Sequence, residues 1–81
     1  MRPVTPIQEA SGFLSIKFSG NIAVIHTKPS YASTLAYNID NYEFPEIIGT
    51  IAGDDTVMLI IAEDAGRGAV LRALRTIIPN I

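Results

Sequence analysis

The residues best suited to chemistry are two adjacent aspartates, Asp54 and Asp55, which follow Gly53 between two apolar runs. The runs are rich in β-branched residues and predict two strands, with Gly-Asp-Asp as the turn between them. On this interpretation Gly53 bends the backbone at positive φ, and the turn holds two negative charges at the rim of a sheet. Side chains in a turn can converge on one cation, although a solvated acidic turn also accounts for these residues.

Few other side chains could carry catalysis. His26 is the single histidine and the chain has no cysteine, and no nucleophile elbow, phosphate-binding loop or dinucleotide fingerprint is present. We therefore expect His26 to be a structural histidine at a strand end or an interface. A Ca²⁺ loop needs more oxygen ligands than residues 53–55 offer. The sequence predicts no enzyme, no metal site and no cofactor.

The first twelve residues differ in composition from the rest of the chain. Residues 1–12 hold two prolines within four positions, which opposes a helix, and we expect a linker or tail there. The domain itself is expected over residues 13–81. A domain of this size buries only about 60–65% of its unfolded surface, so its own core is marginal.

Two strands and a hairpin are expected at the start of the domain. Residues 14–18 alternate between apolar and polar, residues 22–27 form a second strand, and Gly20-Asn21 signals a two-residue turn. The register of that turn defines two faces. The expected core face carries Leu14, Ile16, Phe18, Ala23 and Ile25. The opposite face is too apolar to be fully solvated and is a candidate for covering by another subunit; it carries Ser15, Lys17, Ile22, Val24 and His26.

The remaining elements complete an α+β fold. A helix is expected from Ser30 as N-cap to about Tyr42, followed by a strand that enters the Gly53 turn. Residues 57–62 are apolar without alternation, which predicts burial on both faces, with the protein's own helices on one side and a partner as a candidate for the other. A last helix is expected between a cap at Asp64 and a stop at Pro79. The order β-β-α-β-β-α predicts two layers, a four-stranded antiparallel sheet with two helices on one face.

Composition bounds the partners and the compartment. The chain is 48% hydrophobic, 17% charged and has a net charge of −2, so the apolar excess predicts burial against copies of itself. The basic residues are scattered, which predicts no contact with nucleic acid by this domain itself. The absence of cysteine, of a signal peptide and of a membrane-spanning run favours a cytoplasmic protein without a membrane partner.

The octet from Gly49 to Thr56 resembles the signature of the C-terminal domain of bacterial arginine repressors. Other segments match the family pattern in the same order. His26-Thr27-Lys28-Pro29 resembles the family's His-Thr-x-Pro at the end of a strand, Asp40 lies late in the following helix, and residues 44–48 lead into the octet. The resemblance covers roughly residues 13–78.

The resemblance implies an assembly and a ligand. In this family the C-terminal domain forms trimers that pair face to face into a hexamer, and L-arginine binds between trimers as corepressor. A separate N-terminal winged-helix domain, absent from these residues, binds operators of arginine metabolism genes. We therefore expect an excised C-terminal fragment, or else a free-standing arginine-sensing module. A planar guanidinium can donate two parallel hydrogen bonds to one carboxylate, so aspartates suit this ligand.

The resemblance also assigns site residues. Asp54 and Asp55 match the acidic pair that holds arginine, one of them reaching it across the trimer interface. Asp40 matches the helix aspartate, while Thr50 and Ala52 match the strand positions that line the site.

Two positions depart from the family pattern. Ser33 stands where the better-known members carry a glutamine that contacts the ligand, and a bridging water could compensate for its shorter side chain. Ser30 stands where a glycine commonly follows the proline. The departure at Ser33 keeps an alternative open, a structural module that oligomerises without any small ligand.

Overall fold

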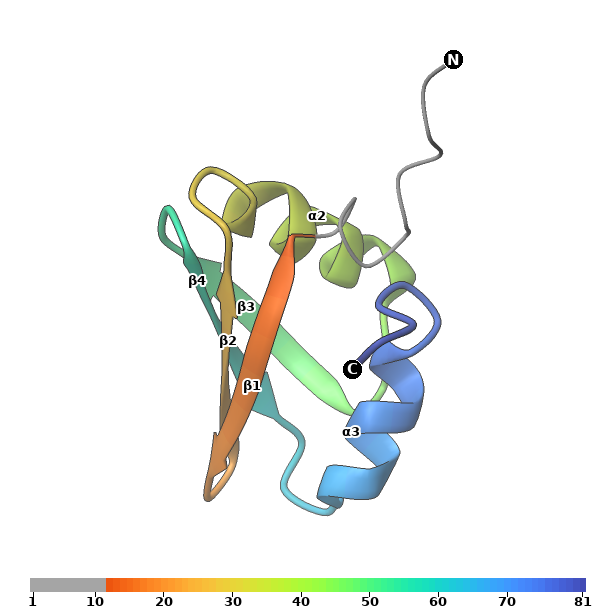
Figure 1. Ribbon diagram of the computed structural model, residues 1–81. Helices are drawn as coiled ribbons and strands as arrows, with labels where there is room; N and C mark the ends of the chain where they lie inside the picture. The colour runs from red at the N-terminus through yellow and green to blue at the C-terminus, as the bar shows by residue number, and fades with distance from the viewer. Residues whose placement is uncertain (1–11) are drawn as a thin grey trace.

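The computed structural model describes residues 12–81, so the expected linker lies outside the described residues except for Gly12. The elements follow the expected order. The strands form one antiparallel sheet in the order β1-β2-β4-β3, with β2 and β4 central. Both helices lie against one face of this sheet, which confirms the two-layer α+β fold (Figure 1). The elements are β1 (Phe13–Ser19), β2 (Ile22–Thr27), α2 (Ala32–Tyr42), β3 (Ile47–Ala52), β4 (Thr56–Ile61) and α3 (Arg67–Leu74).

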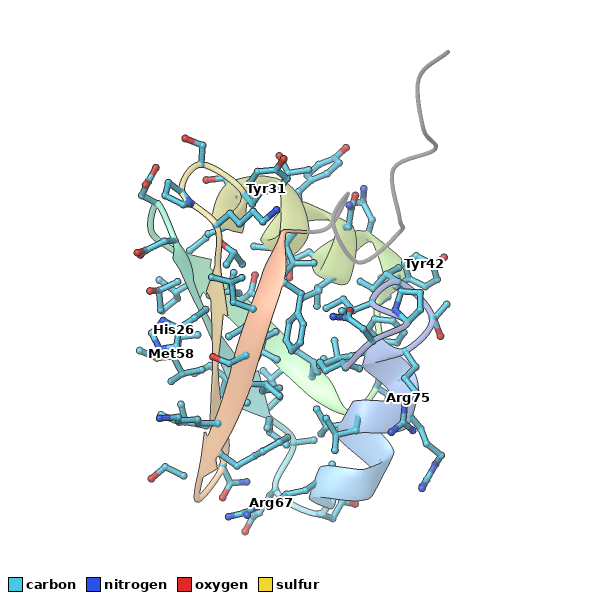
Figure 2. All side chains as sticks on the ribbon, in the orientation of Figure 1. His26, Tyr31, Tyr42, Met58, Arg67 and Arg75 are labelled. Carbon is cyan, nitrogen blue, oxygen red and sulfur yellow. The ribbon has the colours of Figure 1, made fainter. Side chains whose placement is uncertain are left out.

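The face of the sheet turned away from the helices is called the open face here. The expected hairpin register is confirmed, with Ser19 opposite Ile22 and Lys17 opposite Val24. Figure 2 shows His26 and Met58 pointing away from both helices. The cross-strand pairs place the apolar residues Ile22, Val24, Ile51, Met58 and Ile60 on the open face.

Burial alternates along β4 within one chain, so the helices cover one face and the other face is open. Val57 and Leu59 are fully buried, whereas Met58 is 37% exposed. The uniform apolar run therefore reflects a strand whose second face is open within one chain. On β3, the neighbouring Ile51 is 63% exposed on that same face.

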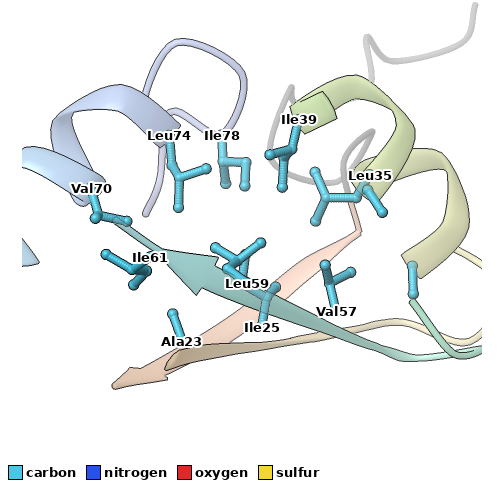
Figure 3. Packing of buried hydrophobic residues seen from close by; sticks show 12 residues of the cluster. Ala23, Ile25, Leu35, Ile39, Val57, Leu59, Ile61, Val70, Leu74 and Ile78 are labelled. Atoms are coloured by element: carbon cyan, nitrogen blue, oxygen red, sulfur yellow. The ribbon is translucent and has the colours of Figure 1, made fainter. Parts of the chain in front are cut away.

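The core lies between the sheet and the two helices (Figure 3). The expected stripe of α2 is buried, because apolar residues at i, i+3, i+4 and i+7 fall on one side of a helix. Phe13, Ile16 and Phe18 of β1 pack partly buried against this cluster. The buried hydrophobic residues are Ala23, Ile25, Ala32, Leu35, Ala36, Ile39, Val57, Leu59, Ile61, Val70, Leu74 and Ile78.

The expectation that Leu14 lies on the core face was wrong. A bulge interrupts the β1–β2 register between Phe13 and Ser15. The extra residue shifts the alternation by one position, so Leu14 is 58% exposed and Phe13 packs against the core instead.

The expected conformation at three loop positions was also wrong. Gly53 does not adopt a positive φ, and its N–H closes the turn by donating to the Thr56 carbonyl at 2.8 Å. Ser30 is not a helix cap, because its φ of 74° lies in the left-handed region and Tyr31 occupies the N-cap. Asp64 does not cap α3, whose N-cap is Gly66 without a side-chain hydrogen bond.

The last helix is shorter than expected. It ends at Leu74, and hydrogen-bonded turns continue the chain to Ile78, whose N–H donates to the Leu74 carbonyl at 2.8 Å. Val70 and Leu74 are the buried residues of α3, and Ile78 in the turns that follow is buried as well. None of the helices within residues 12–81 has the length and apolarity needed to cross a membrane.

Candidate functional site

The turn that carries the aspartate pair is held in place by its backbone. The Asp54 carbonyl accepts hydrogen bonds from the N–H groups of Ser30 at 3.0 Å and Ala32 at 3.4 Å. The Asp55 carbonyl accepts one from the N–H of Thr27 at 2.8 Å. These bonds tie the β3–β4 turn to the segment that joins β2 to α2. Because the main chain makes them, the two carboxylates stay available for other partners.

The side chains of the pair are exposed and have different surroundings. The Thr56 hydroxyl donates to Asp55 Oδ1 at 3.1 Å. No hydrogen bond or ion pair joins the Asp54 carboxylate to another side chain of residues 12–81. The two carboxylates are adjacent in sequence and exposed, and the high dielectric constant of the solvent weakens the repulsion between them.

The side chains of Asp40 and Thr50 are in direct contact. From the sequence, only the family resemblance placed these two residues in the same site. The Thr50 hydroxyl lies 3.1 Å from both Asp40 Oδ1 and Asp40 Oδ2. One hydroxyl proton is shared between the two oxygens, so the carboxylate of α2 is oriented over the edge strand β3. The contact holds the carboxylate in one direction.

The candidate residues form a strip along α2 and β3. Ala32 contacts Asp54, and Asp40 contacts Thr50, so α2 runs antiparallel to β3. At a rise of about 1.5 Å per residue, Asp40 lies about 12 Å along the helix from Ala32. On the strand, Thr50 and Ala52 lie about 7 Å apart on one face, and Asp54 follows in the turn after β3. We call this surface the α2–β3 strip; it consists of Ser33, Asp40, Thr50, Ala52, Asp54 and Asp55.

The structure thus brings the candidate residues onto one surface without joining its two ends. Ser33 and Ala52 are exposed between the ends. Asp40 and the aspartate pair are too far apart to hold one small cation together within a single chain. This agrees with the absence of any cluster of three potential metal-ligating side chains within residues 12–81.

A hollow of about 270 Å³ adjoins the Asp40 end of the strip and does not reach the aspartate pair. Glu43 is the residue here that the sequence did not single out. It is the C-cap of α2, and its N–H donates to the Asp40 carbonyl at 3.1 Å. Its φ of 54° at the C-cap is a feature that sequence periodicity does not show. The hollow is lined by Ile39, Asp40, Glu43, Phe44, Ile47 and Ile48.

The chain is similar to arginine repressors over most of its length. A family model described as "Arginine repressor, C-terminal domain" matches residues 10–76. The arginine repressor of Phocaeicola vulgatus is 63% identical over 71 residues, which cover 88% of this chain and 45% of the relative. That of Bacteroides thetaiotaomicron is 61% identical over the same shares. That of Symbiobacterium thermophilum is 42% identical over 62 residues, which cover 76% of this chain and 41% of the relative.

The chain spans less than half the length of these curated relatives. The matched segment includes the whole α2–β3 strip. The family description names a repressor rather than an enzyme, in agreement with the expectation drawn from the sequence. Because the family model matches residues 10–76 of the 81 residues, this chain belongs to the family of arginine repressor C-terminal domains.

Proposed function

We propose that this chain is the corepressor-binding and oligomerisation domain of an arginine-responsive transcriptional repressor. It binds L-arginine at the interface between trimers and drives their assembly into a hexamer. The α2–β3 strip supports this proposal, because it carries carboxylates at both ends and the small exposed residues Ser33 and Ala52 between them. The proposal accounts for why these acidic groups lie on the surface without forming a metal cluster within residues 12–81.

The length of the strip suits an extended arginine. Seven bonds of about 1.5 Å separate its α-nitrogen from a terminal guanidinium nitrogen, a distance of roughly 8–9 Å once bond angles are included. A hydrogen bond of about 2.9 Å at each end extends the reach to roughly 14 Å. That reach is comparable with the axial rise of about 12 Å from Asp40 to Ala32, whose N–H donates to the Asp54 carbonyl. One arginine can therefore interact with carboxylates at both ends.

The difference between the two aspartates suggests how the site is shared. Asp55 is oriented by the Thr56 hydroxyl of its own chain. Asp54 projects from the turn without a side-chain partner in residues 12–81, which suits the aspartate that reaches a ligand bound by the facing trimer. Carboxylates brought together at an interface repel each other and lose hydration, and a bound cation offsets both effects.

The open face supplies a second surface, which we assign to contacts within a trimer. It lies on the opposite side of the sheet from the α2–β3 strip, so both surfaces can be occupied at once. The apolar side chains of its central strands, including the 37% exposed Met58, are removed from water when another copy covers them.

DNA binding is assigned to a part of the protein outside these residues. The curated relatives are more than twice as long as the matched segment. The chain described here has a net charge of −2, which does not favour the phosphate backbone of DNA. We propose that a separate winged-helix domain reads operators in the cytoplasm and that this domain reports the arginine concentration to it.

Calorimetry and a mass measurement test the proposal. We expect L-arginine to bind the 81-residue chain and to shift its mass from trimer towards hexamer in analytical ultracentrifugation. Asp54→Asn should weaken binding about 10- to 100-fold, the effect of losing a charged hydrogen bond, and should leave the trimer intact. Asp64→Asn is the matched control, because it removes an exposed aspartate that lies outside the strip.

Two results would count against the proposal. No heat of binding at millimolar arginine would exclude a corepressor site. A hexamer that forms equally with and without arginine would support the alternative, a ligand-independent oligomerisation module.

A further inference from the structure

Tyr37 lies on the α2–β3 strip although neither the sequence pattern nor the family resemblance singles it out. Its side chain is 66% exposed. With about 100° of rotation per helical residue, Tyr37 is displaced by about 40° from Ser33 and by about 60° from Asp40 around the helix axis. The Thr50 contact fixes Asp40 on the β3 side of α2. Tyr37 therefore stands at the outer rim of the strip, between its two ends.

The direction of a helical side chain places the ring over Ser33. Side chains in a helix lean towards its N-terminus and cover the preceding turn. Ser33 is four residues before Tyr37, so the ring is directed over the turn where the strip has its smallest polar side chain.

We propose that Tyr37 is a binding residue of the arginine site, with its ring face packed against the ligand guanidinium. This inference rests on the proposed function. A cation over an aromatic face is attracted by the ring, and a planar guanidinium also stacks on it. Ser33 follows Ala32, whose N–H contacts the Asp54 carbonyl, so the ring is directed towards the end of the strip where an aspartate of the pair can bind the edge of that guanidinium. The ring thereby supplies contact area that the short Ser33 side chain does not.

The proposal predicts a preference for planar cations. Lysine carries a compact ammonium that does not stack, and citrulline carries a planar group without charge. Removing the ring should therefore weaken the binding of arginine more than the binding of lysine or citrulline. The ratio of the citrulline dissociation constant to that of arginine should fall when Tyr37 is replaced by an aliphatic residue.

The test compares three variants of the 81-residue chain by calorimetry with L-arginine. Tyr37→Phe keeps the ring and should bind within about 2-fold of the unsubstituted chain. Tyr37→Leu keeps apolar bulk without the ring face and should bind about 2- to 30-fold more weakly, the range of cation–π contacts. Tyr42→Leu is the matched control, because it removes another exposed tyrosine from the same helix, 52% exposed, and should not change binding.

The outcomes distinguish the role of Tyr37 from the proposed function. Normal arginine binding and an unchanged citrulline ratio in Tyr37→Leu overturn the role of Tyr37 and leave the proposed function standing. No arginine binding by the unsubstituted chain overturns the proposed function and the role of Tyr37 with it. Weaker binding by Tyr37→Leu, with normal binding by Tyr37→Phe and Tyr42→Leu, supports the ring contact.

Discussion

The contact between Thr50 and Asp40 makes a sharp prediction about preorganisation. Thr50→Val keeps the β-branched shape of the side chain and removes the hydroxyl that lies 3.1 Å from both carboxylate oxygens. The carboxylate of Asp40 then rotates freely in the absence of ligand. Arginine must then fix the orientation of the Asp40 carboxylate when it binds. The affinity for arginine therefore falls, although no charged group has been removed.

The size of the effect follows from the ordering of one side chain. Immobilising a side chain at an interface costs about 0.5–1.5 kcal/mol. Aspartate has few rotamers, so we take the lower part of that range, about 0.5–1 kcal/mol, which is a 2- to 5-fold increase in the dissociation constant. Both groups are at the surface, where solvent competes for the hydrogen bond. The free energy of unfolding should therefore change by less than about 1 kcal/mol.

Titration calorimetry with L-arginine measures the affinity, and urea denaturation of the same samples measures the stability. Thr50→Ser is the control, because it keeps a hydroxyl at the same position and should stay close to the unsubstituted chain. Equal arginine affinity in Thr50→Val and the unsubstituted chain would refute the reasoning. An equal loss of arginine affinity in Thr50→Val and Thr50→Ser would also refute it.

Two further predictions concern stability and assembly. Ser30→Gly should raise the free energy of unfolding by about 1 kcal/mol in urea denaturation, because glycine adopts the left-handed φ of 74° without strain; a decrease would contradict this explanation. Met58→Lys should shift the mass in ultracentrifugation from trimer to monomer, because it places a charge at the centre of the open face. Tyr42→Lys, at a 52% exposed position on α2 in the other layer, is its control and should remain trimeric. A trimeric Met58→Lys variant would show that the trimer forms through another surface.

The sequence was a good guide to the fold because its signals are local and agree with one another. The Gly20-Asn21 turn sets the hairpin register, and that register follows from adjacent residues alone. The stripe of α2 is likewise a property of helical periodicity. The errors occurred where distant groups compete with local preference. Ser30 is a good cap by residue type, yet its N–H is held by the Asp54 carbonyl on another turn, and Tyr31 takes the cap position.

The bulge at Leu14 shows the same limit in a strand. Strict alternation places Leu14 with Ile16 and Phe18, and no residue type near it announces an interruption. The aromatic ring of Phe13 packs against the core instead, and the extra residue is accommodated at the edge of the sheet, where one side of the strand has no neighbouring strand. Such an exchange depends on the shape of the core and not on the local sequence.

The sequence by itself determined the order of the elements, the hairpin register and the family to which the octet around Asp54 belongs. Only the tertiary structure decided how the candidate residues lie relative to one another. Asp40 and Thr50 are ten positions apart in the sequence and come into contact because α2 packs antiparallel to β3. The aspartate pair lies at the opposite end of the same strip because backbone carbonyls tie its turn to the start of α2. Periodicity determines which face a residue occupies, whereas packing of the helix on the sheet determines which faces meet.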